Sequence, residues 1–158
     1  KDLCEMAART GFRVTVVDDR EEFASAERFP AARRVLARGS FAQAFQELAV
    51  TAATCCVVVT RGHAMDLECL DYALHTPAPY VGLIGSRRKI KLIFDDLLAE
   101  GVSPEALKRV HAPVGLDIGS QTVMEIAVSI TAELVAVRNL GATRPRTRAA
   151  ESIAAERL

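Results

Sequence analysis

A chain of 158 residues and 17.1 kDa has the size of one ordinary domain. Half of its residues are hydrophobic and a quarter are charged, which permits a packed core and excludes a wholly disordered chain. Twenty basic and twenty acidic residues cancel, so a general attraction to nucleic acid is excluded and any basic site must be local.

Four cysteines, Cys4, Cys55, Cys56 and Cys69, form neither a CxxC pair nor a Cys/His spacing that suits zinc. We therefore expect no metal site and interpret the cysteines as core residues in a reducing cytoplasm. The most apolar long stretch, Val123 to Val137, contains two glutamates and is too short for a bilayer core of ~30 Å. No contact with a membrane is expected.

Segments typical of strands alternate with segments typical of helices, which predicts a Rossmann-like α/β fold with a doubly wound, mostly parallel sheet and helices on both faces. The expected strands are Val14–Asp18, Arg34–Arg38, Cys55–Thr60, Tyr80–Ile84 and Arg109–Pro113. Lys1–Thr10 is expected to be the last part of a helix. Further helices are expected at Phe41–Val50, Met65–His75, Ile90–Leu98 and Val123–Arg138, with a short helix that begins at Ser103 and Pro104. Ser40 with Gln43, and Thr122 with Glu125, have the spacing of capping boxes.

Two acids, Asp18 and Asp19, end the first expected strand. In dinucleotide-binding folds an acid at the end of the second strand holds the adenosine ribose, about 20 residues after a glycine-rich turn. That spacing places the glycine-rich turn at or before Lys1. In the usual strand order, the strand that leads into this turn lies in the sheet between the Val14 strand and the Cys55 strand. We therefore expect the sheet to lack its central strand. Whether the two acids bind a nucleotide or only end a strand in solvent stays open.

The first candidate loop contains Thr60, Arg61, Gly62 and His63 and follows an expected central strand. Open α/β sheets bind ligands at the carboxyl ends of their strands. Glycine allows close backbone approach, arginine can bind an anion through two hydrogen bonds, and histidine can exchange a proton near neutral pH. His63 is the candidate acid/base residue, and a purely structural or exposed histidine is the alternative.

The second candidate loop consists of Gly85, Ser86, Arg87, Arg88 and Lys89, at the start of the helix that follows the next strand. Free backbone N–H groups, a hydroxyl and three cations predict a phosphate or pyrophosphate site. Three cations in the first turn oppose the helix dipole, and a bound anion would relieve that conflict. The alternative is a solvated basic turn, because the three cations point in different directions around the helix.

The third candidate loop follows the last expected strand and leads to the Val123 helix. Its glycines, Gly115 and Gly119, predict a shaped turn, and its polar residues, His111, Asp117 and Ser120, are candidates to face a ligand. Asp117 is equally compatible with a role in satisfying local backbone donors.

Several motifs occur in order along this chain. They are VVDDR at Val16–Arg20, FP at Phe29 and Pro30, TRGH at Thr60–His63 followed by Asp66, IGSRRK at Ile84–Lys89, HAPVGLDIG at His111–Gly119, and EIAVSI at Glu125–Ile130. Together they resemble the Rossmann domain of the XdhC/CoxI family, the xanthine dehydrogenase accessory proteins. The resemblance runs from about Gly11 to Arg138.

The resemblance implies a chaperone of the molybdenum cofactor, in its molybdopterin or dinucleotide form, rather than a catalyst. Such proteins take part with a cysteine desulfurase in sulfuration of the cofactor and deliver it to a molybdenum hydroxylase such as xanthine dehydrogenase. It implies that Arg87 or Arg88 binds the phosphate and that His63 lies near the pterin or metal end. His111 and Asp117 would shape the pocket wall.

Two other functions stay open. Asp18 and Asp19 are compatible with an NAD(P)-dependent oxidoreductase or a nucleotide-sensing domain, and the loops are compatible with an assembly scaffold that binds no small molecule. We expect the Rossmann domain to occupy residues 1–142 and an Arg-rich tail, flexible or forming a short helix, to occupy residues 143–158. Whether two copies pair as a homodimer is left open.

Overall fold

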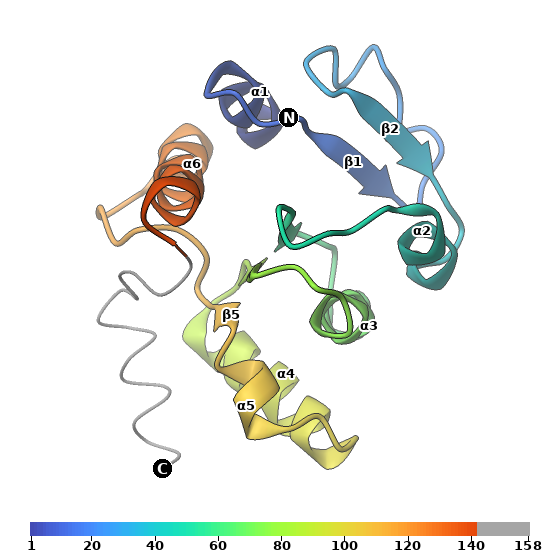
Figure 1. Ribbon diagram of the computed structural model, residues 1–158, viewed down its shortest axis with the longest axis vertical. Helices are drawn as coiled ribbons and strands as arrows, with labels where there is room; N and C mark the ends of the chain where they lie inside the picture. Colours follow the sequence, from blue (N-terminus) through green and yellow to red (C-terminus); the bar gives the residue numbers. More distant parts are fainter. Residues whose placement is uncertain (142–158) are drawn as a thin grey trace.

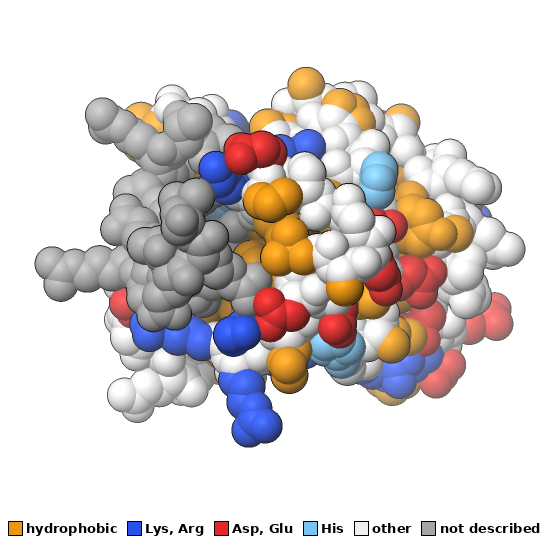
Figure 2. All heavy atoms as spheres, turned by 90° about the horizontal axis from the view of Figure 1, so that it is seen from below, with side chains coloured by type: hydrophobic (Ala, Val, Ile, Leu, Met, Phe, Trp, Pro, Cys, Tyr) orange, Lys and Arg blue, Asp and Glu red, His pale blue; other side chains and the backbone are white. Residues whose placement is uncertain are grey.

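The computed structural model describes residues 1–141, and the expected tail at 143–158 lies outside them. Figure 1 shows helices packed around short strands. Within the described range, no helix is long and apolar enough to cross a membrane. Acidic and basic side chains both reach the face seen in Figure 2, with hydrophobic side chains between them.

The strands form two parallel sheets. β1 (Thr15–Asp18) pairs with β2 (Arg34–Ala37), and β4 (Tyr80–Leu83) lies between β3 (Cys55–Val58) and β5 (Val110–His111). No strand of residues 1–141 pairs with the second edge of β1 or of β3, so the two sheets stay separate. The expected α/β class and the expected separation of these two strands are confirmed.

Helices cover both faces of the larger sheet. Their bounds are α1 Asp2–Arg9, α2 Phe41–Glu47, α3 His63–Leu74, α4 Arg87–Ala99, α5 Pro104–Leu107 and α6 Val123–Leu140. α3 and α4 pack on one face, where Val81 and Leu83 of β4 point, and α1 and α6 pack on the other, where Tyr80 points. The predicted apolar stripe of α4 is confirmed, since Ile90 and Leu97 are fully buried.

The predicted N-caps form, with one difference. Thr122 and Glu125 make both hydrogen bonds of a capping box, whereas Ser40 accepts from the Gln43 amide without a returning bond. Several boundaries also differ from the predictions, among them those of α2, α3 and β5. α2 ends at Glu47 rather than Val50 because the next residue turns extended; α3 starts at His63 rather than Met65, directly after a glycine with φ +98°; and β5 is limited to two residues.

All four cysteines are free thiols, and burial dominates their chemistry. Burial raises the pKa of Cys56 to about 11 and that of Cys69 higher still. At pH 7.5 only about one Cys56 thiol in a few thousand is ionised. We expect a thiol reagent such as DTNB to react far more slowly with the native chain than with the chain in urea, where four thiols should react at once. Equal rates in the two states would contradict this packing.

Candidate functional site

The second and third candidate loops meet in a pocket of ≈ 270 Å³. Arg87, the first residue of α4, and the segment 113–120 line it. Ile126 and Ser129 of α6 also line it. Of the predicted site residues, Arg87, Gly115, Asp117 and Gly119 line this pocket.

The pocket wall is held against α6 by a glycine and a serine. Gly115 has φ +98°, and a Cβ at this position would overlap Ser129 Oγ. Ser129 Oγ donates to the Leu116 carbonyl at 2.5 Å, and the Leu116 amide donates to the Ser129 carbonyl at 3.3 Å. Because only glycine allows this close approach, the sequence fixes the distance between the loop and the helix.

A buried carboxylate behind the pocket ties the loop to the sheet. Glu133 of α6 is 2% exposed and accepts hydrogen bonds from the Gly115 amide at 2.7 Å and the Tyr80 hydroxyl at 2.7 Å. Its other oxygen lies 2.9 Å from His111 Nδ1. His111 is therefore buried in this network and does not line the pocket, so its position differs from the wall position that the resemblance implies.

The hydrogen bonds decide the charge of this carboxylate. Burial alone would raise the pKa of Glu133, but the bonds from His111, Tyr80 and Gly115 outweigh it and hold the pKa below its ordinary value. Burial, with the neighbouring Glu133 charge, raises the pKa of the Tyr80 phenol far above its ordinary value. At neutral pH the network therefore holds a carboxylate with a phenol that stays protonated and donates.

The three cations at the start of α4 have different surroundings. Ser86 caps the helix by accepting from the Lys89 amide at 3.3 Å. Arg87 lines the pocket, Arg88 is exposed and does not line it, and Lys89 Nζ pairs with the buried carboxylate of Asp66 in α3. Gly85 precedes this turn and does not line the pocket. Of the predicted phosphate-binding cations, Arg87 alone is thus among the pocket-lining residues.

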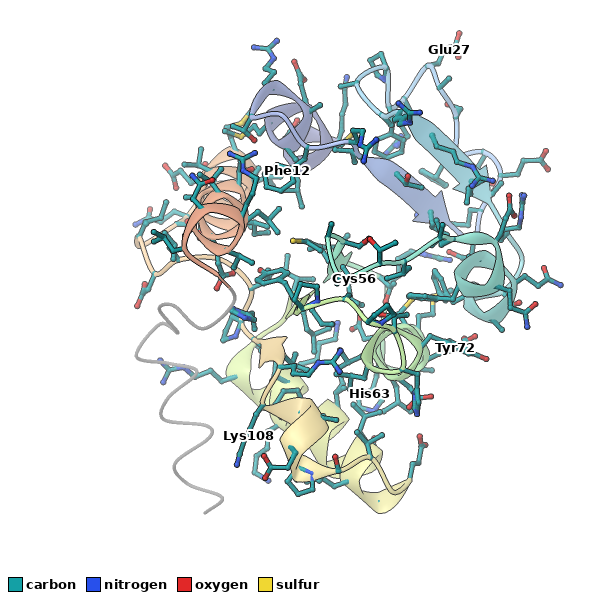
Figure 3. All side chains as sticks on the ribbon, in the orientation of Figure 1. Phe12, Glu27, Cys56, His63, Tyr72 and Lys108 are labelled. Carbon is teal, nitrogen blue, oxygen red and sulfur yellow. The ribbon has the colours of Figure 1, made fainter. Side chains whose placement is uncertain are left out.

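The first candidate loop lies apart from this pocket. Thr60 Oγ1 donates to Asp66 Oδ1 at 2.5 Å, so Asp66 joins the first loop to the second. Gly62 provides the turn into α3 and lines no part of the pocket. His63 Nε2 lies 2.6 Å from Asp96 Oδ2 of α4, on the side of α3 that faces α4 (Figure 3).

Both acids at the end of β1 have basic partners. Arg20 donates to both oxygens of Asp18, at 2.9 and 3.1 Å, and Arg61 donates to Asp19 at 2.7 Å. Burial would raise the pKa of Asp18, but the bonds from Arg20 hold it below its ordinary value. The Arg61–Asp19 pair also links the two sheets. A ribose hydroxyl would therefore have to compete with a guanidinium for either acid.

Sequence reasoning missed the acids that organise the site. Asp66 looked like an ordinary first-turn acid, and Glu133 was only one of two charges in an apolar stretch. A signal existed for Glu133, because an acid in the middle of the apolar helix 123–140 must be paired if its position is buried. Asp96 had no such signal. In the described part of the chain, no three His, Cys, Asp or Glu side chains lie close enough to hold a metal ion.

One family model and several known proteins match this chain. The family model described as the XdhC Rossmann domain matches residues 1–134. The chain is 36% identical over 137 residues to the uncharacterized protein YqeB of Escherichia coli (strain K12). It is 31% identical over 136 residues to a probable xanthine dehydrogenase subunit of Bacillus subtilis (strain 168). These matches cover 87% and 86% of the chain, but 25% and 39% of the two relatives.

A solved structure extends the agreement to three dimensions. A chain described as a xanthine dehydrogenase from Bacillus halodurans superposes with a TM-score of 0.74 at 25% identity. The match covers 94% of this chain and 42% of that one. The chain thus spans less than half the length of each of these three proteins.

Proposed function

This chain belongs to the XdhC family, and on that premise we propose that it acts as an accessory protein of a xanthine dehydrogenase. The relatives support this coarse function, since the Bacillus subtilis protein is described as a probable subunit of xanthine dehydrogenase and the Bacillus halodurans protein as a xanthine dehydrogenase. The finer part of the proposal is that the domain binds molybdenum cofactor and assists its sulfuration and its insertion into a molybdenum hydroxylase. A cysteine desulfurase would be the sulfur-supplying partner.

The pocket between Arg87 and the segment 113–120 is the proposed binding site for the cofactor. Molybdopterin carries a phosphate, and the dinucleotide forms carry a pyrophosphate. Arg87 offers a guanidinium at the start of α4, where the helix dipole also favours an anion. Ser120 adds a hydroxyl oxygen that is buried without a hydrogen-bond partner among the described residues. Together these donors fit a phosphate.

The remaining residues of the site would bind and orient rather than react. The cofactor supplies the metal and its dithiolene sulfurs, whereas the apolar groups of the pocket wall would exclude water from the flat ring. The buried carboxylate of Glu133 would keep the wall in one conformation. This division of roles supports the proposal that the domain carries the cofactor.

Replacing Arg87 with alanine in the full-length protein tests the site. Loss of a charge-assisted contact to phosphate should weaken binding of molybdenum cofactor and of inorganic pyrophosphate about 10- to 100-fold. Isothermal titration measures both affinities. Arg88→Ala is the matched control, because Arg88 is an adjacent exposed arginine that does not line the pocket, and it should change either affinity by less than about threefold.

The same titration separates this function from the nucleotide-binding alternative. If Arg87→Ala leaves cofactor binding unchanged, the proposed site is wrong. If the wild-type protein binds NAD or NADP tightly and the molybdenum cofactor not at all, the chaperone proposal itself fails. Asp18→Asn is the variant to use in the titration with NAD or NADP, because it should weaken nucleotide binding only if Asp18 contacts the ribose.

A further inference from the structure

The pocket contains one positive and one negative side chain that are not paired with each other. Arg87 and Asp117 both line it, and among residues 1–141 neither makes an ion pair or a side-chain hydrogen bond. Asp18, Asp19, Asp66 and Asp96, by contrast, all have basic partners. Both charges are thus available to a ligand that enters this pocket.

Apolar residues also line this pocket. Val114, Leu116 and Ile126 line the pocket along with the two charged residues. An apolar wall favours a flat ring over a flexible polyanion, because a polyanion would place its charges against the apolar side chains. Asp117 also repels a second phosphate. The ligand that satisfies all these groups carries one anionic end, a planar apolar body, and hydrogen-bond donors at the far end.

We propose that Asp117 binds the aminopyrimidinone edge of a pterin while Arg87 binds the phosphate at its other end. This edge presents a ring N–H and an adjacent amino group side by side, and a carboxylate accepts from such a pair through both of its oxygens. The inference rests on the proposed function of the pocket and assigns its polarity, with the pterin ring on the Asp117 side. Asp117 becomes a specificity-determining residue, which chooses pterins over other phosphate-bearing ligands.

Two simpler probes divide the ligand into its parts. Neopterin carries the pterin edge without a phosphate, and inorganic pyrophosphate carries the anion without a ring. In the full-length protein, Asp117→Asn should weaken neopterin binding about tenfold, since the amide turns a donor toward the donors of the ring. The same variant should leave pyrophosphate affinity unchanged or slightly higher, because a repelling charge is removed. Arg87→Ala should show the opposite pattern.

The control is Glu105→Gln, an exposed acid outside the pocket, which should alter neither affinity. Neopterin fluorescence and isothermal titration give the two affinities. If wild-type protein binds pyrophosphate through Arg87 but does not bind neopterin, or if Asp117→Asn binds neopterin like wild type, the inference is overturned and the proposed function survives. If Arg87→Ala retains full pyrophosphate affinity while Asp117→Asn loses neopterin, the assignment of the pterin edge to Asp117 stands. The assignment of the phosphate to Arg87 is then overturned, together with the phosphate site of the proposed function.

Discussion

Replacing Glu133 with alanine should lower the free energy of unfolding by about 3–5 kcal/mol, a large part of the stability of a domain of this size. The substitution leaves the Tyr80 hydroxyl, His111 and the Gly115 amide buried without their common acceptor. A buried donor without a partner costs about 1–3 kcal/mol. Urea denaturation followed by circular dichroism measures the loss.

Conservative variants separate the parts of this effect. Tyr80→Phe removes one donor and should cost about 1–2 kcal/mol. Glu133→Gln keeps a carbonyl acceptor but loses the charge, so its cost should fall between those of Tyr80→Phe and Glu133→Ala. Glu68→Ala, an exposed helix position, should stay within about 0.5 kcal/mol. A Glu133→Ala protein as stable as wild type would show that the network contributes nothing.

The dependence on pH has a definite sign. The folded-state pKa of Glu133 lies below its ordinary value of 4.5, so the folded chain binds this proton less readily than the unfolded chain. Its stabilising contribution is therefore complete above about pH 4.5 and is lost as the pH falls through the folded-state pKa. The stability difference between wild type and Glu133→Ala should be largest at neutral pH and shrink on acidification. A constant difference down to pH 3 would contradict the pKa direction.

Asp66→Ala should also cost about 3–5 kcal/mol, because it breaks a buried ion pair and leaves the Lys89 ammonium partly buried without a counter-charge. Asp66 is fully buried and also accepts the Thr60 hydroxyl, so the first candidate loop should loosen with it. Thermal unfolding measures the loss in stability, and limited proteolysis near Arg61 reports the loop.

A double replacement distinguishes a lost attraction from an unpaired charge. Asp66→Leu combined with Lys89→Met removes both charges and should recover much of the stability lost in Asp66→Ala, since apolar pairs often replace buried ion pairs at little cost. Removing the exposed Lys108–Glu105 pair by Lys108→Ala should change stability by less than about 1 kcal/mol. If the double variant is no more stable than Asp66→Ala, the unpaired Lys89 charge does not account for the loss.

Much of the fold could be predicted because it depends on local chemistry. A run of β-branched residues marked β1, and continuous apolar runs marked β3 and β4. A serine or threonine at the N-cap position marked the starts of α2, α5 and α6. The separation of β1 from β3 followed from counting back from Asp18. Boundaries were less predictable, because the start of α3 at His63 depends on the positive φ of Gly62.

The sequence by itself determined the α/β class, the order of strands and helices along the chain, and the family. Residue periodicity, caps and ordered motifs are local properties, so they can be recognised without the tertiary structure. It also placed Arg87 and the segment 113–120 at strand ends. The tertiary structure decided which of these groups meet: Arg87 joins Asp117 in one pocket, Lys89 is taken by Asp66, and His111 is turned inward to Glu133. These groups lie far apart in the chain, and the packing of α3, α4 and α6 on β4 and β5 brings them together. Lys89 pairs with Asp66 and His111 with Glu133, whereas Arg87 and Asp117 line one pocket without pairing.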